Sequence, residues 1–305
     1  MLFRRRQARR VSLRLNYVPN AEHAPYFLGV KKQIYAREAI QLEIEPGTGS
    51  VDTAKLVGIG HSDFGIAVAD AIVVGRGLDL PVKSLSVLLQ QNPNVVASLA
   101  DKGIKRPTDL YGKRVGTNAR STTYAVWLAF AKAANLDLSR IEAVELGTST
   151  APGLMVNGTI DACLLLSTNE KVALEAGGCR LECMDPADYG VRSYGQVLFT
   201  SESAILKDAG LVERMTRATV SAWNYSLQHG DEAISALKEA APEVDVAQEL
   251  AKWREIVPRT KARDGDVPIA FGAQGAAGWR QTYETFRAAG LIARAYDPET
   301  IIYAA

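Results

Sequence analysis

The chain has 305 residues, of which 47% are apolar and 23% are charged, and its formal net charge at pH 7 is +1. This composition allows a sizeable core and room for two medium domains. The near-neutral balance argues against nucleic acid or an acidic membrane surface as the main partner, because both select concentrated positive charge. No predominantly apolar run reaches about 18 residues, so the sequence predicts no membrane span.

The first ten residues hold the only dense basic cluster. No apolar run follows it, because residues 11–15 alternate like a strand, so this segment is not a complete secretory signal. We therefore expect residues 1–10 to be a disordered arm, or the remnant of a truncated start, outside the fold. The cluster consists of Arg4, Arg5, Arg6, Arg9 and Arg10.

A stretch near the N-terminus is predicted to change from strand to helix, with polar side chains in the break. Pro19 must end the strand because it lacks an N–H, and Pro25 suits the first turn of a helix. Between these elements lie Asn16, Tyr17 and His23. Open α/β sheets bind ligands beyond the carboxyl ends of their strands, so these residues are candidate ligand contacts. The alternative is that Tyr17 belongs to the core and the others are ordinary loop residues.

Strands and helices alternate through the first third of the chain. Helices between successive strands indicate crossover connections and a largely parallel sheet. The predicted strands are 11–16, 40–44, 63–68 and 82–89. An apolar stripe at helical spacing predicts a helix over 26–35, and a second, short helix is predicted at 54–59.

A short internal repeat favours two similar lobes. Residues 56–66 and 154–164 both run from an apolar helix end through Gly to an Asp that opens a buried strand. The glycine suits a left-handed helix stop, and two units of one design suggest two lobes, although so short a match also arises by chance.

The lobe boundaries follow from two apolar runs, 94–99 and 196–200, which we interpret as hinge strands. Lobe I would then comprise residues 11–95 and 196–305, and lobe II residues 96–195. The predicted lobe II strands are 113–116, 141–146 and 160–166, and its helices are 121–134, 152–157 and 169–176. Further helices at 206–228, 231–240, 246–257 and 275–289 would cover lobe I.

The loop before the helix at 121–134 is a candidate site for a polar or anionic group. It offers free backbone N–H groups and the positive end of a helix dipole, with Asn118, Ser121, Thr122 and Thr123 adding polar side chains. The simpler explanation is an N-cap by Ser121 or Thr122, and both roles can hold at once. Arg120 could pair with a ligand carboxylate or sulfonate, or could be solvated.

Three further polar residues follow predicted strands. Ser50 lies in a strand-end loop, and Asp70 comes just after the strand at 63–68. Asp70 could bind an amino or amidine-like group, or could cap the next helix. Ser167 holds the equivalent position in lobe II, where N-capping is its simplest role.

Catalytic and metal-binding patterns are missing from the sequence. The three cysteines and three histidines have no metal-ligand spacing, so we expect no metal. Cys179 and Cys183 would lie roughly 13 Å apart along a strand, too far for a disulfide. There is no Gly-x-Ser-x-Gly elbow, P-loop or Gly-x-Gly-x-x-Gly, and no motif places a nucleophile near His23. We expect neither catalysis nor a cofactor.

Three segments resemble one family of binding proteins. Residues 15–29 carry Asn-Tyr-x-Pro followed by a histidine, residues 60–66 read Gly-His-Ser-Asp-Phe-Gly-Ile, and residues 109–116 read Asp-Leu-Tyr-Gly-Lys-Arg-Val-Gly. These segments resemble the periplasmic substrate-binding proteins of ABC transporters, in the NMT1/THI5-like branch. That branch holds the sulfonate, nitrate and taurine binders and the thiamine-pyrimidine-precursor binders.

The resemblance implies an α/β protein of the type II periplasmic-binding fold, with two α/β lobes joined by two hinge strands. It implies a solute-binding protein of an ABC importer that captures a small planar heterocyclic, aromatic or sulfonate-like compound by hinge closure. The implied partners are ABC permease and ATPase subunits, and the implied location is periplasmic or membrane-anchored and extracytoplasmic. We expect a monomer.

Carried over by position, Asn16, Tyr17 and His23 would line the ligand cleft in the first lobe. Tyr17 stands where the pyrimidine binders often have Trp, and a flat ring can stack on a flat heterocycle. Residues 118–123 match the polar loop that in relatives holds a phosphate or another polar group.

Departures from the family pattern bear on ligand and chemistry. Gln33 replaces a usual Gly at the end of the first helix, which is a small strain. Ser167 replaces a Glu of the pyrimidine binders, which places an aminopyrimidine ligand in doubt. Residues 65–74 lack the Lys and His of the pyrimidine synthase, and residues 189–197 lack its Cys. A synthase-like enzyme of the thiamine pathway and a non-exported ligand sensor stay open as alternatives.

Overall fold

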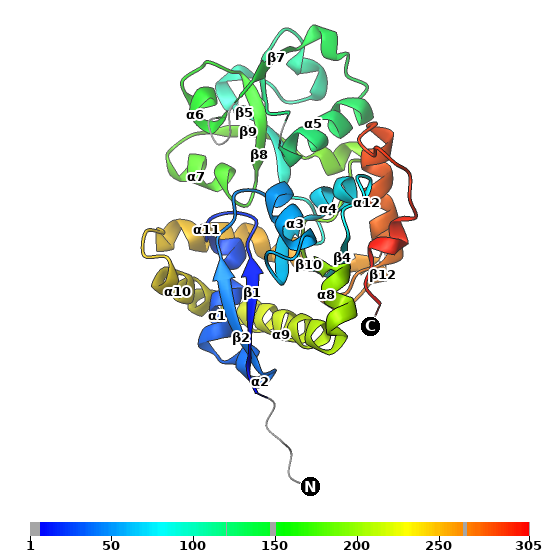
Figure 1. Ribbon diagram of the computed structural model, residues 1–305. Coiled ribbons are helices and arrows are strands. Elements are labelled where there is room, and N and C mark those ends of the chain that lie inside the picture. Colours follow the sequence, from blue (N-terminus) through cyan, green and yellow to red (C-terminus); the bar gives the residue numbers. More distant parts are fainter. Residues whose placement is uncertain (1–6, 120, 147–150, 265–266, 305) are drawn as a thin grey trace.

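Residues 7–119, 121–146, 151–264 and 267–304 are described by the computed structural model, and within them the strands form two five-stranded sheets and one short pair (Figure 1). In sheet order, the first sheet consists of β2 (Ile40–Glu45), β1 (Arg9–Arg14), β3 (Phe64–Val68), β10 (Gln196–Ser201) and β4 (Val82–Val87). The second consists of β7 (Glu142–Glu145), β6 (Arg114–Thr117), β8 (Ala162–Leu166), β5 (Asn94–Leu99) and β9 (Leu181–Met184). The short pair is β11 (Arg263–Asp264) and β12 (Val267–Pro268).

Each sheet is largely parallel, as expected from the crossover connections, and contains one antiparallel strand that the sequence did not predict. β10 runs antiparallel between β3 and β4, and β5 runs antiparallel between β8 and β9. These are the two runs that the sequence suggested as hinge strands. Each is a full, buried member of one sheet, because its continuous apolar pattern lets both of its faces pack.

The chain passes between the sheets in the segments just before these strands. Residues 88–93 lead from β4 to β5, and residues 185–195 lead back from β9 to β10. The two crossings are paired with each other: the N–H groups of Leu88 and Leu89 donate to the Gln196 carbonyl at 2.8 and 3.0 Å, and Gly195 N–H donates to the Leu89 carbonyl at 2.8 Å. Asn92 N–H also donates to the Ser193 carbonyl at 3.0 Å.

Helices cover both sheets, and the segments after β10 pack mainly on the first (Figure 1). The longest, α9, brings the buried Trp223 edge-on against Tyr26 of α1. α12 contacts α4 beside the first sheet and α5 beside the second. The helices are α1 (Ala24–Lys31), α2 (Ile34–Arg37), α3 (Ser50–Gly58), α4 (Ala69–Arg76), α5 (Thr122–Ala133), α6 (Ala151–Val156), α7 (Glu170–Ala176), α8 (Glu202–Lys207), α9 (Ala209–Gln228), α10 (Gly230–Ala240), α11 (Val246–Ile256) and α12 (Ala276–Ala288).

Two sequence predictions about boundaries are wrong. Arg9 and Arg10 belong to β1 rather than to an arm, and Arg9 pairs with Asp208 at 3.0 Å; residues 1–6 lie outside the described residues. The helix predicted at 206–228 is divided into α8 and α9. Asp208 makes the break because its carboxylate accepts the Leu211 N–H at 2.9 Å and so begins a new helix.

The loop after β1 is held tightly against the loop after β2. A Cβ on Gly47 would lie 1.9 Å from the Leu15 carbonyl oxygen, so only glycine permits this approach. Gly47 N–H donates to the Tyr17 carbonyl at 3.2 Å, and the Thr53 hydroxyl donates to Leu15 at 2.8 Å. These contacts fix the backbone beneath Asn16 and Tyr17.

Gln33 adopts a left-handed conformation with φ of 58° where α1 ends, which is the strain expected of a non-glycine residue there. The three cysteines are free thiols, and Cys163 is buried in the core of the second sheet. Within the described part of the chain, no helix is both long and apolar enough to cross a bilayer.

Candidate functional site

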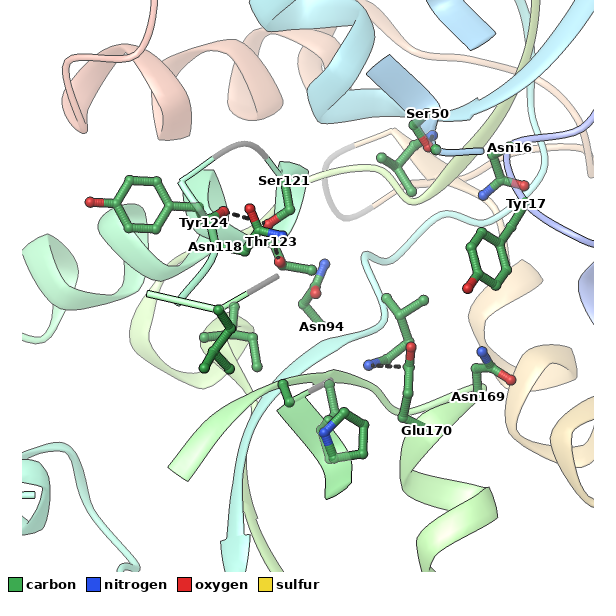
Figure 2. Close-up of a pocket in the computed structure, with 18 of the residues that line it drawn as sticks. Asn16, Tyr17, Ser50, Asn94, Asn118, Ser121, Thr123, Tyr124, Asn169 and Glu170 are labelled. Atoms are coloured by element: carbon green, nitrogen blue, oxygen red, sulfur yellow. Dashed lines mark hydrogen bonds between the residues drawn. The ribbon is translucent and has the colours of Figure 1, made fainter. Parts of the chain in front are cut away.

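A cleft of about 270 Å³ lies between the two sheets, beyond the carboxyl ends of β1, β3, β6 and β8 (Figure 2). Its lining from the first sheet comes from the loops after β1 and β2 and from the end of β3. Its lining from the second sheet comes from the loops after β6 and β8 and from the start of β5. This is the position that the strand-end rule predicts for a ligand.

Six of the ten predicted site residues line this cleft: Asn16, Tyr17, Ser50, Asn118, Ser121 and Thr123. His23, Asp70 and Ser167 are buried elsewhere and do not line it. Thr122 begins α5, but its side chain lies outside the described residues, as does Arg120.

His23 supports the cleft from behind instead of lining it. Its ring is completely buried; Nδ1 accepts the Asn20 N–H at 3.3 Å, so Nε2 carries the proton and donates to Asn16 Oδ1 at 2.7 Å. Burial lowers the pKa of His23 to about 3, with a hydrogen bond to the Val18 backbone opposing the shift. The neutral imidazole therefore orients the Asn16 amide, whose Nδ2 is left to face the cleft.

Tyr17 is 39% exposed, so the core alternative for this residue is wrong. Its ring points across the cleft towards Asn169 and Glu170 (Figure 2). A half-exposed aromatic ring at the mouth of a cleft can cover a flat ligand on one face.

A cluster of hydroxyl groups lies at the start of α5. Ser121 occupies the N-cap position, but its hydroxyl donates to the Asn118 carbonyl at 2.8 Å and contacts the Thr123 hydroxyl at 2.6 Å. Its side chain therefore does not cap the helix N–H groups, which corrects the simpler explanation. The Ala119 N–H donates to Glu145 Oε1 at 3.0 Å.

Ser50 lines the cleft and Asp70 does not, although both residues follow strands of the first sheet. The Ser50 hydroxyl accepts the Val68 N–H at 3.1 Å and lies at the cleft wall. Asp70 is the second residue of α4, whose N-cap is Val68, so the capping alternative is wrong. At about 100° of rotation per helical residue, this position turns the carboxylate away from the cleft towards α3.

Two carboxylates in the cleft were missed from the sequence, the buried Glu22 and the half-buried Glu170. Glu22 Oε1 accepts the Thr168 hydroxyl at 2.6 Å, and Oε2 accepts Gln196 Nε2 at 3.4 Å. Burial raises the pKa of Glu22; the Thr168 hydrogen bond opposes this, and the negative charge of Glu170 adds to it. Glu22 lies within the family-like segment 15–29, but no pattern in the neighbouring sequence indicates that it is buried.

Glu170 is the second of these carboxylates, and it lies opposite Tyr17 (Figure 2). It opens α7, and its Oε2 accepts the Leu166 N–H at 2.9 Å. Burial raises its pKa, while the hydrogen bonds from backbone N–H groups oppose the shift. It lies three residues beyond Ser167, the position at which the resemblance expected a Glu.

Asn94 adds an amide at the floor of the cleft. Its Nδ2 donates to Asn92 Oδ1 at 2.6 Å, and its buried Oδ1 has no partner among the described residues. The cleft thus combines the aromatic side chains of Tyr17, Tyr124 and Trp127 with two carboxyl groups, amides and hydroxyls, a set suited to binding a polar flat molecule. Among the described residues, no group of three or more His, Cys, Asp or Glu could hold a metal ion.

Comparison with known sequences gives one family and named relatives. The family model described as NMT1/THI5-like matches residues 20–233. A formylaminopyrimidine-binding protein of Halalkalibacterium halodurans is 24% identical over 275 residues, which cover 89% of this chain and 82% of that protein. A 4-amino-5-hydroxymethyl-2-methylpyrimidine phosphate synthase of Legionella pneumophila is 27% identical over 238 residues, covering 77% and 75%.

Comparison with solved structures supports the fold. The periplasmic aliphatic sulphonate binding protein SsuA of Escherichia coli superimposes with a TM-score of 0.76 at 16% identity, covering 97% of this chain and 92% of that one. The two sheets and the cleft between them therefore have the architecture of periplasmic binding proteins, as the sequence predicted.

Proposed function

The chain belongs to the NMT1/THI5-like family, and on that premise we propose that it is the solute-binding component of an ABC importer. Its ligand is a small planar nitrogen heterocycle that carries an amino group. The ligand is held in the cleft between the two sheets, and the protein acts by capture and closure, without chemistry.

The arrangement of Tyr17, Glu22 and Glu170 in one cleft is the observation that carries this proposal. The Tyr17 ring covers the flat face of the ligand. A carboxyl group can form two hydrogen bonds along an edge where a ring nitrogen stands beside an amino group. Glu22 is buried and Glu170 is half-buried, and the negative charge of Glu170 helps to raise the pKa of Glu22, so a ligand with donor groups relieves their mutual repulsion.

The same two carboxyl groups disfavour the sulfonate alternative. A sulfonate would bring a fixed negative charge into a cleft that already holds Glu22 and Glu170, at a cost in desolvation and repulsion. The hydroxyls of Ser121 and Thr123, at the opposite end, suit a neutral polar substituent such as a formyl or hydroxymethyl group.

Closure follows from the two-lobe organisation. Lobe I comprises the first sheet with the chain before residue 88 and after residue 195, and lobe II comprises the second sheet with the chain between the crossings. The paired crossings are the hinge, a few residues near strand ends that absorb the rotation. This assigns β5 to lobe II from its first residue, slightly earlier than the sequence suggested.

Import requires a permease and an ATPase as partners and an extracytoplasmic location, and we include all three in the proposal. The named binding-protein relative and the periplasmic structural neighbour support them.

Binding is favoured over the synthase alternative by the chain's own residues. The Legionella relative is named a synthase. Residues 65–74 of this chain hold neither the Lys nor the His that the family resemblance implies for synthases. His23 is buried, neutral and engaged on both ring nitrogens, so it is not available as a base in the cleft.

The test is calorimetric titration of the purified chain with an N-formyl aminopyrimidine, 4-amino-5-hydroxymethyl-2-methylpyrimidine and an aliphatic sulfonate. We expect saturable binding of at least one pyrimidine, its recovery unchanged by mass spectrometry, and no binding of the sulfonate. Tight sulfonate binding without pyrimidine binding would overturn the ligand class. Conversion of the pyrimidine to a product would overturn the non-catalytic role.

Two matched variants locate the ligand. Glu170→Gln removes a carboxylate from the cleft and should weaken pyrimidine binding by about tenfold or more. Glu175→Gln lies on the same helix, paired with Lys171 at 2.9 Å outside the cleft, and should bind as the natural chain does. Equal affinity of the two variants would exclude Glu170 as a ligand contact.

A further inference from the structure

A second cavity, of about 340 Å³, lies between α3, α4 and the beginning of α5. It is separated from the cleft by Ser121 and Tyr124, which line both spaces, and the Tyr124 side chain points away from the cleft residues (Figure 2). Its walls are largely apolar: Val51, Ala54, Val74, Leu80, Ala125 and Leu291.

Asp70 is the acidic group of this second cavity. The residue is 1% exposed, and its Oδ1 accepts the N–H of its neighbour Ala71 at 3.0 Å. Its Oδ2 is buried and has no hydrogen-bond partner among the described residues. A buried carboxylate without a counter-charge is costly, and burial accordingly raises the pKa of Asp70 to about 7.

Lys55 does not supply the missing counter-charge. It lines the same cavity but is exposed, and the Asp70 Oδ2 atom has no partner within hydrogen-bond distance. A solvated lysine at the rim contributes little to a buried carboxylate, because water screens its charge. The walls around Asp70 are thus largely apolar, and its Oδ2 atom has no hydrogen-bond partner among the described residues.

We propose that this cavity is a second ligand site, which binds a small primary amine with its ammonium group on Asp70 Oδ2 and its apolar body against α3, α4 and α5. An ammonium group donates to a carboxylate through a charge-assisted hydrogen bond, and the apolar walls bury the rest of the molecule. Recognition by one buried acid inside an apolar cavity follows the usual composition of small-molecule sites. The site is distinct from the heterocycle cleft and does not depend on the function proposed for it.

The test uses three amines as probes, n-butylamine, benzylamine and 2-phenylethylamine, with benzyl alcohol as the neutral counterpart of benzylamine. Calorimetric titration of the natural chain should show saturable one-to-one binding of at least one amine and at least about tenfold weaker binding of the alcohol. Saturable binding of none of the three amines overturns the site. Equal binding of benzylamine and benzyl alcohol overturns the role of charge.

Three variants distinguish this site from the cleft. Asp70→Asn keeps the acceptor for Ala71 N–H and should weaken amine binding by about tenfold or more, and Ala125→Phe should abolish it by filling the cavity. Glu170→Gln, in the cleft, should leave amine binding within about twofold. If Glu170→Gln abolishes amine binding while Asp70→Asn and Ala125→Phe retain it, the amine binds in the cleft and the proposal is wrong.

Discussion

The Thr168 hydroxyl donates a hydrogen bond of 2.6 Å to the Glu22 carboxylate, and this contact joins loops from the two different sheets. Both residues are buried, and the other oxygen of Glu22 accepts from Gln196 at the start of β10. Gln196 in turn accepts the Tyr26 hydroxyl at 3.0 Å. One carboxyl group therefore connects the N-terminal loop, the second sheet and the returning crossing.

Thr168→Val should loosen the two lobes, because the isosteric side chain keeps the packing but leaves Glu22 Oε1 unpaired. We expect the free energy of unfolding to fall by about 1–3 kcal/mol and the radius of gyration in solution scattering to rise. Thr260→Val is the control, since among the described residues the Thr260 hydroxyl bonds to the nearby Val257 carbonyl and not across the lobes. A scattering profile of Thr168→Val identical to that of the control would show that this contact does not hold the lobes together.

Tyr17→Ala should weaken binding of the cognate heterocycle by about 1–3 kcal/mol, because stacking and apolar burial are lost. Calorimetry on the variant and on Tyr17→Phe measures the effect. Phenylalanine keeps the ring and should retain most of the affinity. If the alanine variant binds as tightly as the natural chain, the ring does not cover the ligand.

His23 should make the protein sensitive to acid. Its pKa is lowered from 6.5 to about 3 in the folded state, so the folded chain binds fewer protons than the unfolded chain. The stability is complete above pH 6.5 and is lost as the pH falls towards 3. Between pH 7 and 4.5 the loss should be about 2–3 kcal/mol in urea denaturation.

Comparison with two variants isolates the His23 contribution. His23→Gln removes the titrating ring and should show a smaller acid loss, whereas His61→Gln, at an exposed position, should behave as the natural chain does. An unchanged pH profile in His23→Gln would mean that the buried ring does not stay neutral.

Asp70 should have the opposite dependence. Its folded pKa is raised from 3.8 to about 7, so the folded chain binds more protons, and stability is complete below pH 3.8 and lost as the pH rises through 7. Asp70→Asn should not show this loss of stability, because the asparagine side chain does not ionise. Its free energy of unfolding relative to the natural chain should therefore grow between pH 4 and pH 8, by up to about 4 kcal/mol.

Thermal and urea unfolding at pH 4, 6 and 8 measure this difference, with the exposed Asp101→Asn as a control that should follow the natural chain throughout. If the difference in free energy of unfolding between Asp70→Asn and the natural chain is the same at all three pH values, the Asp70 carboxylate ionises as a solvated group does. That result would contradict its burial.

Local patterns predicted most of the elements and six of the residues that line the cleft. The strand-end rule led to Asn16, Tyr17, Ser50 and the loop before α5, because a strand followed by a polar loop is visible in the sequence. It placed Asp70 wrongly because α4 begins directly at Ala69, and the helical rotation carries the next side chain out of the cleft.

The remaining cleft residues depend on contacts between distant segments. Glu22 is buried by Thr168 and Gln196, which lie 146 and 174 residues away in sequence, so no local pattern could indicate it. Glu170 is typical of the first turn of any helix, where acids favour the dipole, and its position in the cleft depends on how α7 meets the other sheet. His23 was predicted to line the cleft from its position in the strand-end loop and from the family resemblance, neither of which indicates that its ring is buried behind Asn16.

The pairing of the two crossings limits how the halves of the molecule can move. Two neighbouring backbones held together by amide–carbonyl bonds, as Leu89 and Gly195 are, act as a ribbon that can twist but cannot shear. In the closure proposed above, one rotational coordinate would govern the approach of the halves, and translation of one past the other would be suppressed. A ligand between them would then meet both walls in a single register, so that shape selectivity would come from the backbone before any side chain contributes.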